Sequence, residues 1–238
     1  RTKMTAEVIA AAKNLKVIGR MGVGVDNIDL KAAQAHQISV VNAAVATTQA
    51  VAELTLGFMF ALVREIPRAD ASMKAGQWLK KEFNGAELFG KTLGIIGFGN
   101  IGSTVGKYAQ ALGMNVLAFD PFRDQANIIA QGAECVSFDE LLSRSDMISI
   151  HAPYKEQNHH LINDEAFAKM KDGVFLVDDA RGGIVDEEAL LRALESGKVR
   201  GAALDVYEKE PPINWDLVKH PKVIATPHIG AQTKEAQC

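Results

Sequence analysis

Residues 91–102 constrain the fold of this chain more than any other segment. The apolar residues 94–96 are typical of a buried strand, and they run directly into the pattern Gly97-x-Gly99-x-x-Gly102. In such a turn the first glycine allows the tight bend, the second leaves bare backbone for a pyrophosphate, and the third lets a helix pack closely. Apolar residues then recur at helical spacing over 101–112. The segment predicts a strand, a phosphate-binding turn and a helix with N-terminal amides facing the phosphates, at Asn100 and Ile101.

The next strand predicts which dinucleotide the turn binds. Residues 115–119 are strand-like and end in Asp120, roughly 20 residues beyond the glycines. A carboxylate there accepts hydrogen bonds from an adenosine ribose and repels a 2′-phosphate, so Asp120 favours NAD over NADP. The alternative is that Asp120 only opens the turn that it forms with Pro121.

Composition excludes several classes of function. The 238 residues are 47% hydrophobic and 23% charged, with a net charge of −3 and no basic cluster, which argues against nucleic acid or an anionic membrane as partner. Only Cys135 and Cys238 are present, so neither a disulfide framework nor a cysteine metal site is indicated, and we predict no metal. The longest apolar run, 54–63, is too short to span a bilayer, and no signal peptide is visible. We expect a cytoplasmic protein.

Strand and helix signals alternate along the chain, which favours a parallel sheet covered by helices. We predict a doubly wound α/β (Rossmann) NAD-binding domain over 48–228. A truncated α/β substrate domain is expected over 1–47 and to continue at 229–238. The expected strands are 15–18, 38–41, 94–96, 115–119, 147–150, 174–177, 202–204 and 223–225. The expected helices are 30–36, 48–64 with a resumption to 75 after Pro67, 101–112, 125–131, 138–144, 164–170 and 186–196.

Ligands of open parallel sheets bind beyond the carboxyl ends of the strands, so polar residues at those points are candidates for a site. Together with the glycine-rich turn, they form a series of motifs in a recognisable order. These motifs are Gly22-Val23-Gly24-Val25-Asp26-Asn27-Ile28-Asp29, Val51-Ala52-Glu53-Leu54, Ala180-Arg181-Gly182-Gly183-Ile184-Val185-Asp186-Glu187, Leu204-Asp205-Val206-Tyr207-Glu208-Lys209-Glu210-Pro211-Pro212 and Thr226-Pro227-His228-Ile229-Gly230. On these motifs the chain resembles the D-isomer-specific 2-hydroxyacid dehydrogenases, from about Thr2 to Gln237. Among them it is most similar to enzymes that oxidise 3-phospho-D-glycerate.

The resemblance implies roles for three catalytic residues. Arg181 corresponds to the arginine that holds the substrate carboxylate and polarises the C2 oxygen, a task suited to a planar bidentate cation. His228 corresponds to the acid/base that exchanges a proton with the C2 hydroxyl. Glu210 corresponds to its carboxylate partner, and NAD supplies the hydride chemistry. Taken singly, each residue also fits an ordinary surface loop.

The resemblance also implies binding residues. Val23 and Gly24 would bind the substrate carboxylate through backbone N–H groups, and Arg20 beside them is the candidate cation for a substrate phosphate. The cofactor residues, beyond the glycine-rich turn and Asp120, would be His151, Ala152, Pro153, Asp179, Ala180, Asp205, Gly230 and Ala231. Asp178 departs from the family, in which asparagine is usual. The family also implies chain before Arg1 and a helix after Gln237, as in a flavodoxin-like substrate domain.

The implied reaction is the NAD-dependent oxidation of 3-phospho-D-glycerate to 3-phosphohydroxypyruvate, the entry to serine synthesis. One alternative is another D-2-hydroxyacid dehydrogenase, of the glyoxylate, hydroxypyruvate or D-lactate type. A second is an NAD-sensing corepressor of the same fold. Residues 48–64 are apolar nearly all round, so we expect a homodimer or higher homo-oligomer that covers this helix.

Overall fold

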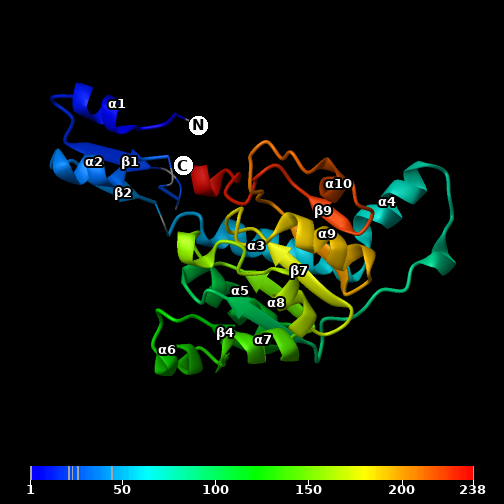
Figure 1. The fold of residues 1–238 in the computed structure, drawn as a ribbon. Helices are drawn as coiled ribbons and strands as arrows, with labels where there is room; N and C mark the ends of the chain where they lie inside the picture. The colour runs from blue at the N-terminus through cyan, green and yellow to red at the C-terminus, as the bar shows by residue number, and fades with distance from the viewer. Residues whose placement is uncertain (1, 21, 23, 26, 44, 238) are drawn as a thin grey trace. The chain divides into compact units, whose positions relative to one another are not determined.

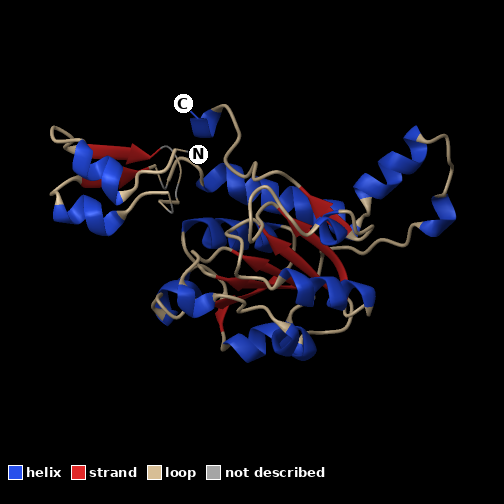
Figure 2. Ribbon diagram, turned by 45° about the horizontal axis from the view of Figure 1, so that its top comes forward, coloured by secondary structure: helices blue, strands red, loops and turns tan. Residues whose placement is uncertain are grey.

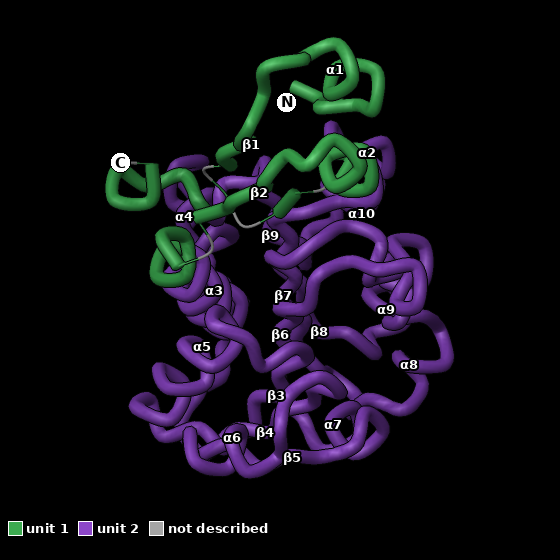
Figure 3. Tube along the Cα trace, turned by 90° about the vertical axis from the view of Figure 1, so that its left-hand side faces the viewer, with its two compact units in different colours: residues 1–50, 231–238 green, residues 51–230 purple. Residues whose placement is uncertain are grey.

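The computed structural model describes residues 2–237 except 21, 23, 26 and 44. The chain divides into two compact units, coloured separately in Figure 3. One unit holds residues 1–50 and 231–238, and the other holds residues 51–230. The assignment of the two units to substrate and cofactor stays a prediction at this point.

The larger unit is built on a seven-stranded sheet in which every strand pairs with its neighbours in parallel. The strand order is β5-β4-β3-β6-β7-β8-β9. Strands β4 and β5 are therefore added on one side of β3, and β6 to β9 are added on its other side. This is the order of the doubly wound dinucleotide-binding fold with one further strand. The strands are β3 (Thr92–Ile96), β4 (Asn115–Phe119), β5 (Glu134–Cys135), β6 (Met147–Ile150), β7 (Val174–Asp178), β8 (Val199–Leu204) and β9 (Val223–Ala225).

Helices cover both faces of this sheet (Figures 1 and 2). On one face, α3 (Thr48–Val63), α5 (Asn100–Ala111) and α6 (Gln125–Ala130) bury Met59, Val105 and Ile128 against the strands. The opposite face carries α7 (Phe138–Arg144), α8 (Asp164–Lys169), α9 (Glu187–Glu195) and α10 (Trp215–Val218) over a second apolar core. Because both faces are covered, every residue of β6 and β7 is buried, and all of them except Ser149 and Asp178 are apolar.

A long excursion separates α3 from β3. Glu65 adopts a left-handed conformation (φ 50°) that ends α3, and α4 (Ile66–Lys74) starts immediately afterwards with Pro67 in its first turn. In Figure 1, α4 and the short η1 (Lys80–Glu82) project away from the sheet before the chain returns to β3. Between the end of α3 and η1, the exposed large apolar side chains of the described residues are Phe60, Ile66, Met73 and Trp78, and Phe89 is exposed shortly before β3.

The smaller unit contains a two-stranded parallel sheet of β1 (Val17–Arg20) and β2 (Ser39–Asn42). Helices α1 (Ala6–Ala11) and α2 (Leu30–Ala35) pack with it around Ile9, Ile18 and Ile38. The short 3-10 helix η3 (Glu235–Gln237) also belongs to the smaller unit, whereas η2 (Glu156–Asn158) belongs to the larger unit. Among the described residues, no helix is both long enough and apolar enough to cross a bilayer.

The doubly wound parallel fold is confirmed. Strands 115–119, 147–150 and 223–225 and helix 138–144 have the predicted bounds. Residues 199–201 extend β8 backwards beyond the predicted start, although Arg200 is exposed and interrupts the apolar pattern. Helices α1 and α10 and strand β5 were not predicted. Strand β5 and helix α10 have only two and four residues, too few to show a clear period.

Candidate active site

The turn after β3 has the backbone expected of a phosphate-binding loop. Gly97 has φ +90°, and a Cβ on it would lie 2.7 Å from the amide nitrogen of Ala152. A methyl group on Gly102 would overlap the carbonyl oxygen of Gly97. Around Gly99, by contrast, a Cβ would meet no atom within 4 Å, and no side chain caps the N-terminus of α5. The turn thus leaves open space and uncapped amides where a pyrophosphate would bind, which fits NAD.

A cavity of about 490 Å³ lies beside this turn, between the ends of β3, β4 and β6. Asp120 lines it, and its two carboxylate oxygens accept hydrogen bonds of 2.9 Å from the N–H groups of Phe98 and Phe122. These bonds fix the carboxylate at the cavity wall, where it suits a ribose hydroxyl. Arg123 and Lys155 also line the cavity, although they are not among the cofactor residues predicted from the sequence.

Two acids at the end of β7 are buried beneath the site. Burial raises the pKa of Asp178 well above its usual range, and the negative charge of Asp179 raises it further, while the N–H groups of Ala180 and Arg181 oppose the shift. Oδ1 of Asp179 faces Nδ1 of His151 at 3.3 Å, and these side chains are 0% and 1% exposed. Burial therefore favours a neutral Asp178. Oδ1 of Asp179 and Nδ1 of His151 are close but form no hydrogen bond, whereas Oδ2 of Asp179 accepts one from the hydroxyl of Thr55.

Asp205 fixes the loop that carries His228. Its Oδ1 accepts hydrogen bonds from the hydroxyl of Thr226 and from the N–H of Ile229, and its Oδ2 accepts one from the N–H of Gly230. Asp205 is fully buried, so these three bonds satisfy a carboxylate that would otherwise be costly to bury. The resemblance implied that Asp205 contacts the cofactor, and in the structure its carboxylate holds both flanks of His228.

His228 and Glu210 form a close pair. Nδ1 of His228 lies 2.7 Å from Oε1 and 2.9 Å from Oε2 of Glu210, although the two residues come from different loops. Because a carboxylate only accepts, Nδ1 carries the proton. His228 adopts a left-handed backbone (φ +56°), which a non-glycine residue rarely does and which is common at functional sites. Within the described residues, Nε2 of His228 has no hydrogen-bond partner.

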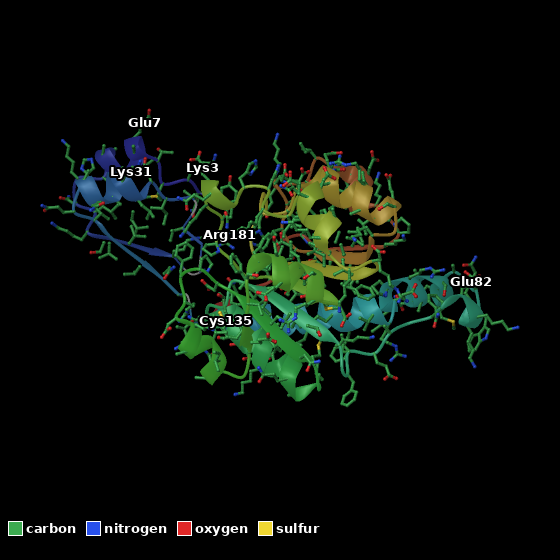
Figure 4. All side chains as sticks on the ribbon, turned by 60° about the horizontal axis from the view of Figure 1, so that its bottom comes forward. Lys3, Glu7, Lys31, Glu82, Cys135 and Arg181 are labelled. Atoms are coloured by element: carbon green, nitrogen blue, oxygen red, sulfur yellow. The ribbon has the colours of Figure 1, made fainter. Side chains whose placement is uncertain are left out.

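The loop of Arg181 (labelled in Figure 4) packs against the loop of Glu210. A methyl group on Gly182 would overlap the carbonyl oxygen of Tyr207 and lie 2.7 Å from the amide nitrogen of Glu208. Only glycine permits this contact. Arg181 is partly buried, and its Nη1 donates a 2.6 Å hydrogen bond to the carbonyl of Ala180.

The predicted substrate loop lies in the smaller unit. Nε of Arg20 donates a 2.6 Å hydrogen bond to the carbonyl oxygen of Gly24, so the guanidinium braces the loop. Val23 lies outside the described residues. Ala231, predicted to contact the cofactor, belongs to the same compact unit as this loop.

Comparison with known proteins decides the family. The D-isomer specific 2-hydroxyacid dehydrogenase, NAD binding domain family matches residues 56–230, which is most of the larger unit. The chain belongs to this family. The predicted cofactor, NAD, is confirmed by the same match, since the matched domain is the family's NAD-binding domain.

Relatives within the family carry different names. D-3-phosphoglycerate dehydrogenase of Archaeoglobus fulgidus is 53% identical over 238 residues, covering 100% of this chain and 45% of that protein. Hydroxypyruvate reductase of Thermotoga maritima is 51% identical over 239 residues, covering 99% of this chain and 77% of that protein. A D-lactate dehydrogenase structure from Aquifex aeolicus, complexed with NAD and lactic acid, has a TM-score of 0.89 and 36% identity. The match covers 98% of this chain and 75% of that one. The chain thus spans less than half of the first relative and about three quarters of the others.

One cluster of ionisable side chains near the family's catalytic motifs was not predicted from the sequence. His160 lies 2.6 Å from Glu208 and 3.7 Å from Asp186, residues 48 and 26 positions away. The adjacent His159-His160 dipeptide was the available signal, but no sequence pattern places it beside the motifs that carry Asp186 and Glu208.

Proposed function

We propose that this chain carries out the NAD-dependent oxidation of 3-phospho-D-glycerate to 3-phosphohydroxypyruvate, the entry to serine synthesis. The His228–Glu210 pair carries the proposal, because it presents a ring nitrogen that has no partner among the described residues, at the carboxyl edge of the dinucleotide-binding sheet. Relatives named D-3-phosphoglycerate dehydrogenase, such as that of Archaeoglobus fulgidus at 53% identity, favour the phosphorylated substrate.

In the proposed reaction, Nε2 of His228 accepts the proton of the C2 hydroxyl as the C2–H bond breaks. The imidazolium that forms is stabilised by Glu210, whose carboxylate already holds Nδ1–H. NAD, when bound, accepts the hydride. In the reverse direction the same nitrogen returns the proton to the C2 oxygen.

Arg181 is proposed to bind the substrate carboxylate and the C2 oxygen. A guanidinium is a planar cation with five donors, a geometry that matches a carboxylate, and Nη1 of Arg181 donates one of its hydrogen bonds to the carbonyl of Ala180. The positive charge also stabilises negative charge that develops on the C2 oxygen during keto-acid reduction. The family resemblance also makes the N–H groups of Val23 and Gly24 candidates for binding a substrate carboxylate.

A second candidate substrate is hydroxypyruvate. It is favoured by the relative named hydroxypyruvate reductase, which is 51% identical and of which this chain covers a larger share, 77%. Both candidates use the same acid/base pair and differ only in whether a phosphate must be bound.

A substrate panel tests the proposal. The full chain is assayed by NADH absorbance with 3-phospho-D-glycerate, D-glycerate, D-lactate and glycolate, and in reverse with the corresponding keto acids. We expect kcat/KM for the phosphorylated pair to exceed every other by at least about tenfold, the effect of one good contact to a charged group. Higher activity on hydroxypyruvate would favour the second candidate, and binding of NAD without any turnover would favour a corepressor.

A homodimer is part of the proposal. Of the apolar side chains of α3, Phe58, Met59, Leu62 and Val63 are buried within the chain, so only part of the helix needs a partner. The remaining support is the exposed apolar set at and beyond its end, Phe60, Ile66, Met73 and Trp78. Light scattering at micromolar concentration should give twice the chain mass, and a monomeric mass would contradict the dimer. A cytoplasmic location is proposed on cysteine content alone.

A further inference from the structure

A cluster of ionisable side chains lies where the Arg181 loop, the Glu210 loop and helix α9 meet. The ring of His160 stands between two carboxylates, with Nε2 2.6 Å from Oε1 of Glu208 and Nδ1 3.7 Å from Oδ2 of Asp186. The side chains are 34%, 38% and 23% exposed, respectively, so solvent screens the pair only partly. On the other side, the ring of His159 stacks on that of His160 with centroids 3.8 Å apart.

The backbone of His160 contacts the second loop. Its N–H donates a 2.8 Å hydrogen bond to the carbonyl oxygen of Gly183, two residues after Arg181. His160 has φ +50°, a left-handed conformation that directs the amide to one loop while the ring reaches the other. A single residue therefore contacts the loop of Arg181 through its backbone and the loop of Glu210 through its ring.

Each partner of His160 is itself fixed. Oδ1 of Asp186 caps helix α9 by accepting the N–H groups of Glu188 and Ala189, both at 3.0 Å. The N–H of Glu208 donates a 2.8 Å hydrogen bond to Oε1 of Glu187, in the first turn of α9. Glu208 precedes Glu210 by only two residues, so a shift at Glu208 moves the carboxylate that holds His228.

We propose that His160 is a positioning residue, which clamps Glu208 and Asp186 and so sets the position of Glu210 relative to the Arg181 loop. The proposal rests on the proposed roles of Arg181, Glu210 and His228. His160 itself touches no reacting atom. Its ring acts through the loop that carries Glu208 and Glu210. Loss of the ring should therefore lower kcat more than it lowers the stability of the fold.

A metal ion is the competing explanation for this cluster, since its ligand atoms lie within 4.8 Å of one another. The observed contacts favour the clamp. Glu208 lies at Nε2 and Asp186 at Nδ1, whereas an ion binds one ring nitrogen at about 2.0–2.1 Å and needs the other ligands on that side. One oxygen of Asp186 is also committed to the helix cap.

The test compares His160→Asn with His159→Asn in the full chain. Asparagine tolerates the left-handed backbone but cannot bridge the two carboxylates. The control removes a neighbouring imidazole that stacks on His160 and lies 3.4 Å from the hydroxyl of Tyr154, and no contact of His159 with a carboxylate is seen within the described residues. Glu208→Gln keeps the side-chain shape and removes its charge, in case His160→Asn perturbs the turn.

We expect His160→Asn and Glu208→Gln each to lower kcat about tenfold, with KM for NAD within twofold, because misplaced catalytic groups lose rate steeply. The kcat of the double variant should be no lower than that of the more impaired single variant, because both substitutions remove the same contact between His160 and Glu208. The melting temperature should stay within about 4 °C, as expected for a partly exposed ion pair. The titratable groups that face the ring are Asp186, Glu208 and the stacked His159. The pH–rate profile should shift in both variants, because a displaced Glu210 holds the ring of His228 less well.

Hydrogen exchange separates this proposal from the proposed function. Without substrate, His160→Asn should speed amide exchange over 205–212, whereas His159→Asn should not. Unchanged exchange and an unchanged pH profile would overturn the clamp even if wild-type turnover is normal. If the wild type shows no turnover but His160→Asn still speeds exchange over 205–212, the clamp is supported and the proposed function is overturned. If a chelator reproduced the His160→Asn phenotype in the wild type, the cluster would be a metal site and the clamp would be wrong.

Discussion

Nδ1 of His228 lies within hydrogen-bond distance of both carboxylate oxygens of Glu210, at 2.7 and 2.9 Å. The two residues are 18 positions apart, and each lies in a loop that other residues hold in place. Asp205 fixes the histidine loop by three hydrogen bonds, and contacts at Gly182 and Glu208 fix the glutamate loop. The geometry thus orients the ring before a substrate binds, which is a common requirement for efficient proton transfer.

Replacing Glu210 by glutamine should move the pH–rate profile. A carboxylate beside the ring favours the imidazolium, and hydroxy-acid oxidation needs the neutral ring. In Glu210→Gln the rise of kcat with pH should therefore begin at lower pH, and keto-acid reduction should lose activity at lower pH than in the wild type. Initial rates across the pH range in both directions check this, with Glu195→Gln on the far end of α9 as the control. Profiles that superimpose would remove Glu210 from the mechanism.

The cofactor preference should depend on Asp120. In the wild type we expect kcat/KM with NAD to exceed that with NADP by at least about 10²-fold, because the carboxylate repels a 2′-phosphate. Asp120→Ala should narrow the ratio, with Arg123 and Lys155 in the same cavity able to pair with that phosphate. An exposed carboxylate, Asp139, provides the control substitution to alanine. Equal wild-type kcat/KM for the two cofactors would rule the assignment out.

Asp178→Asn should raise the melting temperature at neutral pH. Burial raises the pKa of Asp178 in the folded state well above the unfolded value of about 4. At a pH between the unfolded-state and folded-state pKa of Asp178, the unfolded chain has released a proton that the folded chain retains. The free energy of unfolding therefore falls as the pH rises through this range. The variant removes that cost, so its advantage should vanish below about pH 4 and grow towards pH 7.

Calorimetry at several pH values measures this dependence. Asp172→Asn is the control, because that carboxyl is 91% exposed and its pKa is lowered by its hydrogen bond with Lys198. The control should show almost no change in either direction. A pH-independent difference between wild type and Asp178→Asn would contradict the account.

Arg20→Ala should discriminate between substrates. If Arg20 binds the substrate phosphate, KM for 3-phospho-D-glycerate should rise by the equivalent of about 1.5–3 kcal/mol, with little effect on an unphosphorylated keto acid. Its hydrogen bond to Gly24 gives the alternative, since loss of that brace would weaken every substrate alike. Steady-state kinetics on both substrates decide between them, and Lys80→Ala, a cation of η1, should affect neither.

The sequence predicted most of the sheet because its strands are apolar runs bounded by turns. Strand β5 was missed because only two residues form it, and α10 because a four-residue helix shows no period. The glycines at 97 and 102 were assigned their steric roles correctly, and the structure adds that Gly97 packs against the backbone of Ala152.

The site was harder to predict where long-range contacts decide a role. The family motifs point to His228 and Glu210, but no local pattern shows that Asp205 turns its carboxylate to the histidine loop. The His151–Asp179 pair is likewise invisible in sequence, because it depends on β6 and β7 being neighbours in register. His160 was not predicted as a site residue, because its partners lie 26 and 48 residues away in the sequence.

The most direct test of the proposed chemistry is the turnover of His228→Ala with the best substrate of the panel, followed by NADH absorbance, beside the affinity for NAD measured by calorimetry. We predict that kcat falls by roughly 10²–10⁴-fold, the usual contribution of a positioned acid/base. The affinity for NAD should be unchanged, because Gly97, Gly99 and Asp120 are untouched. Near-normal turnover in this variant would contradict the assignment of His228 as the acid/base.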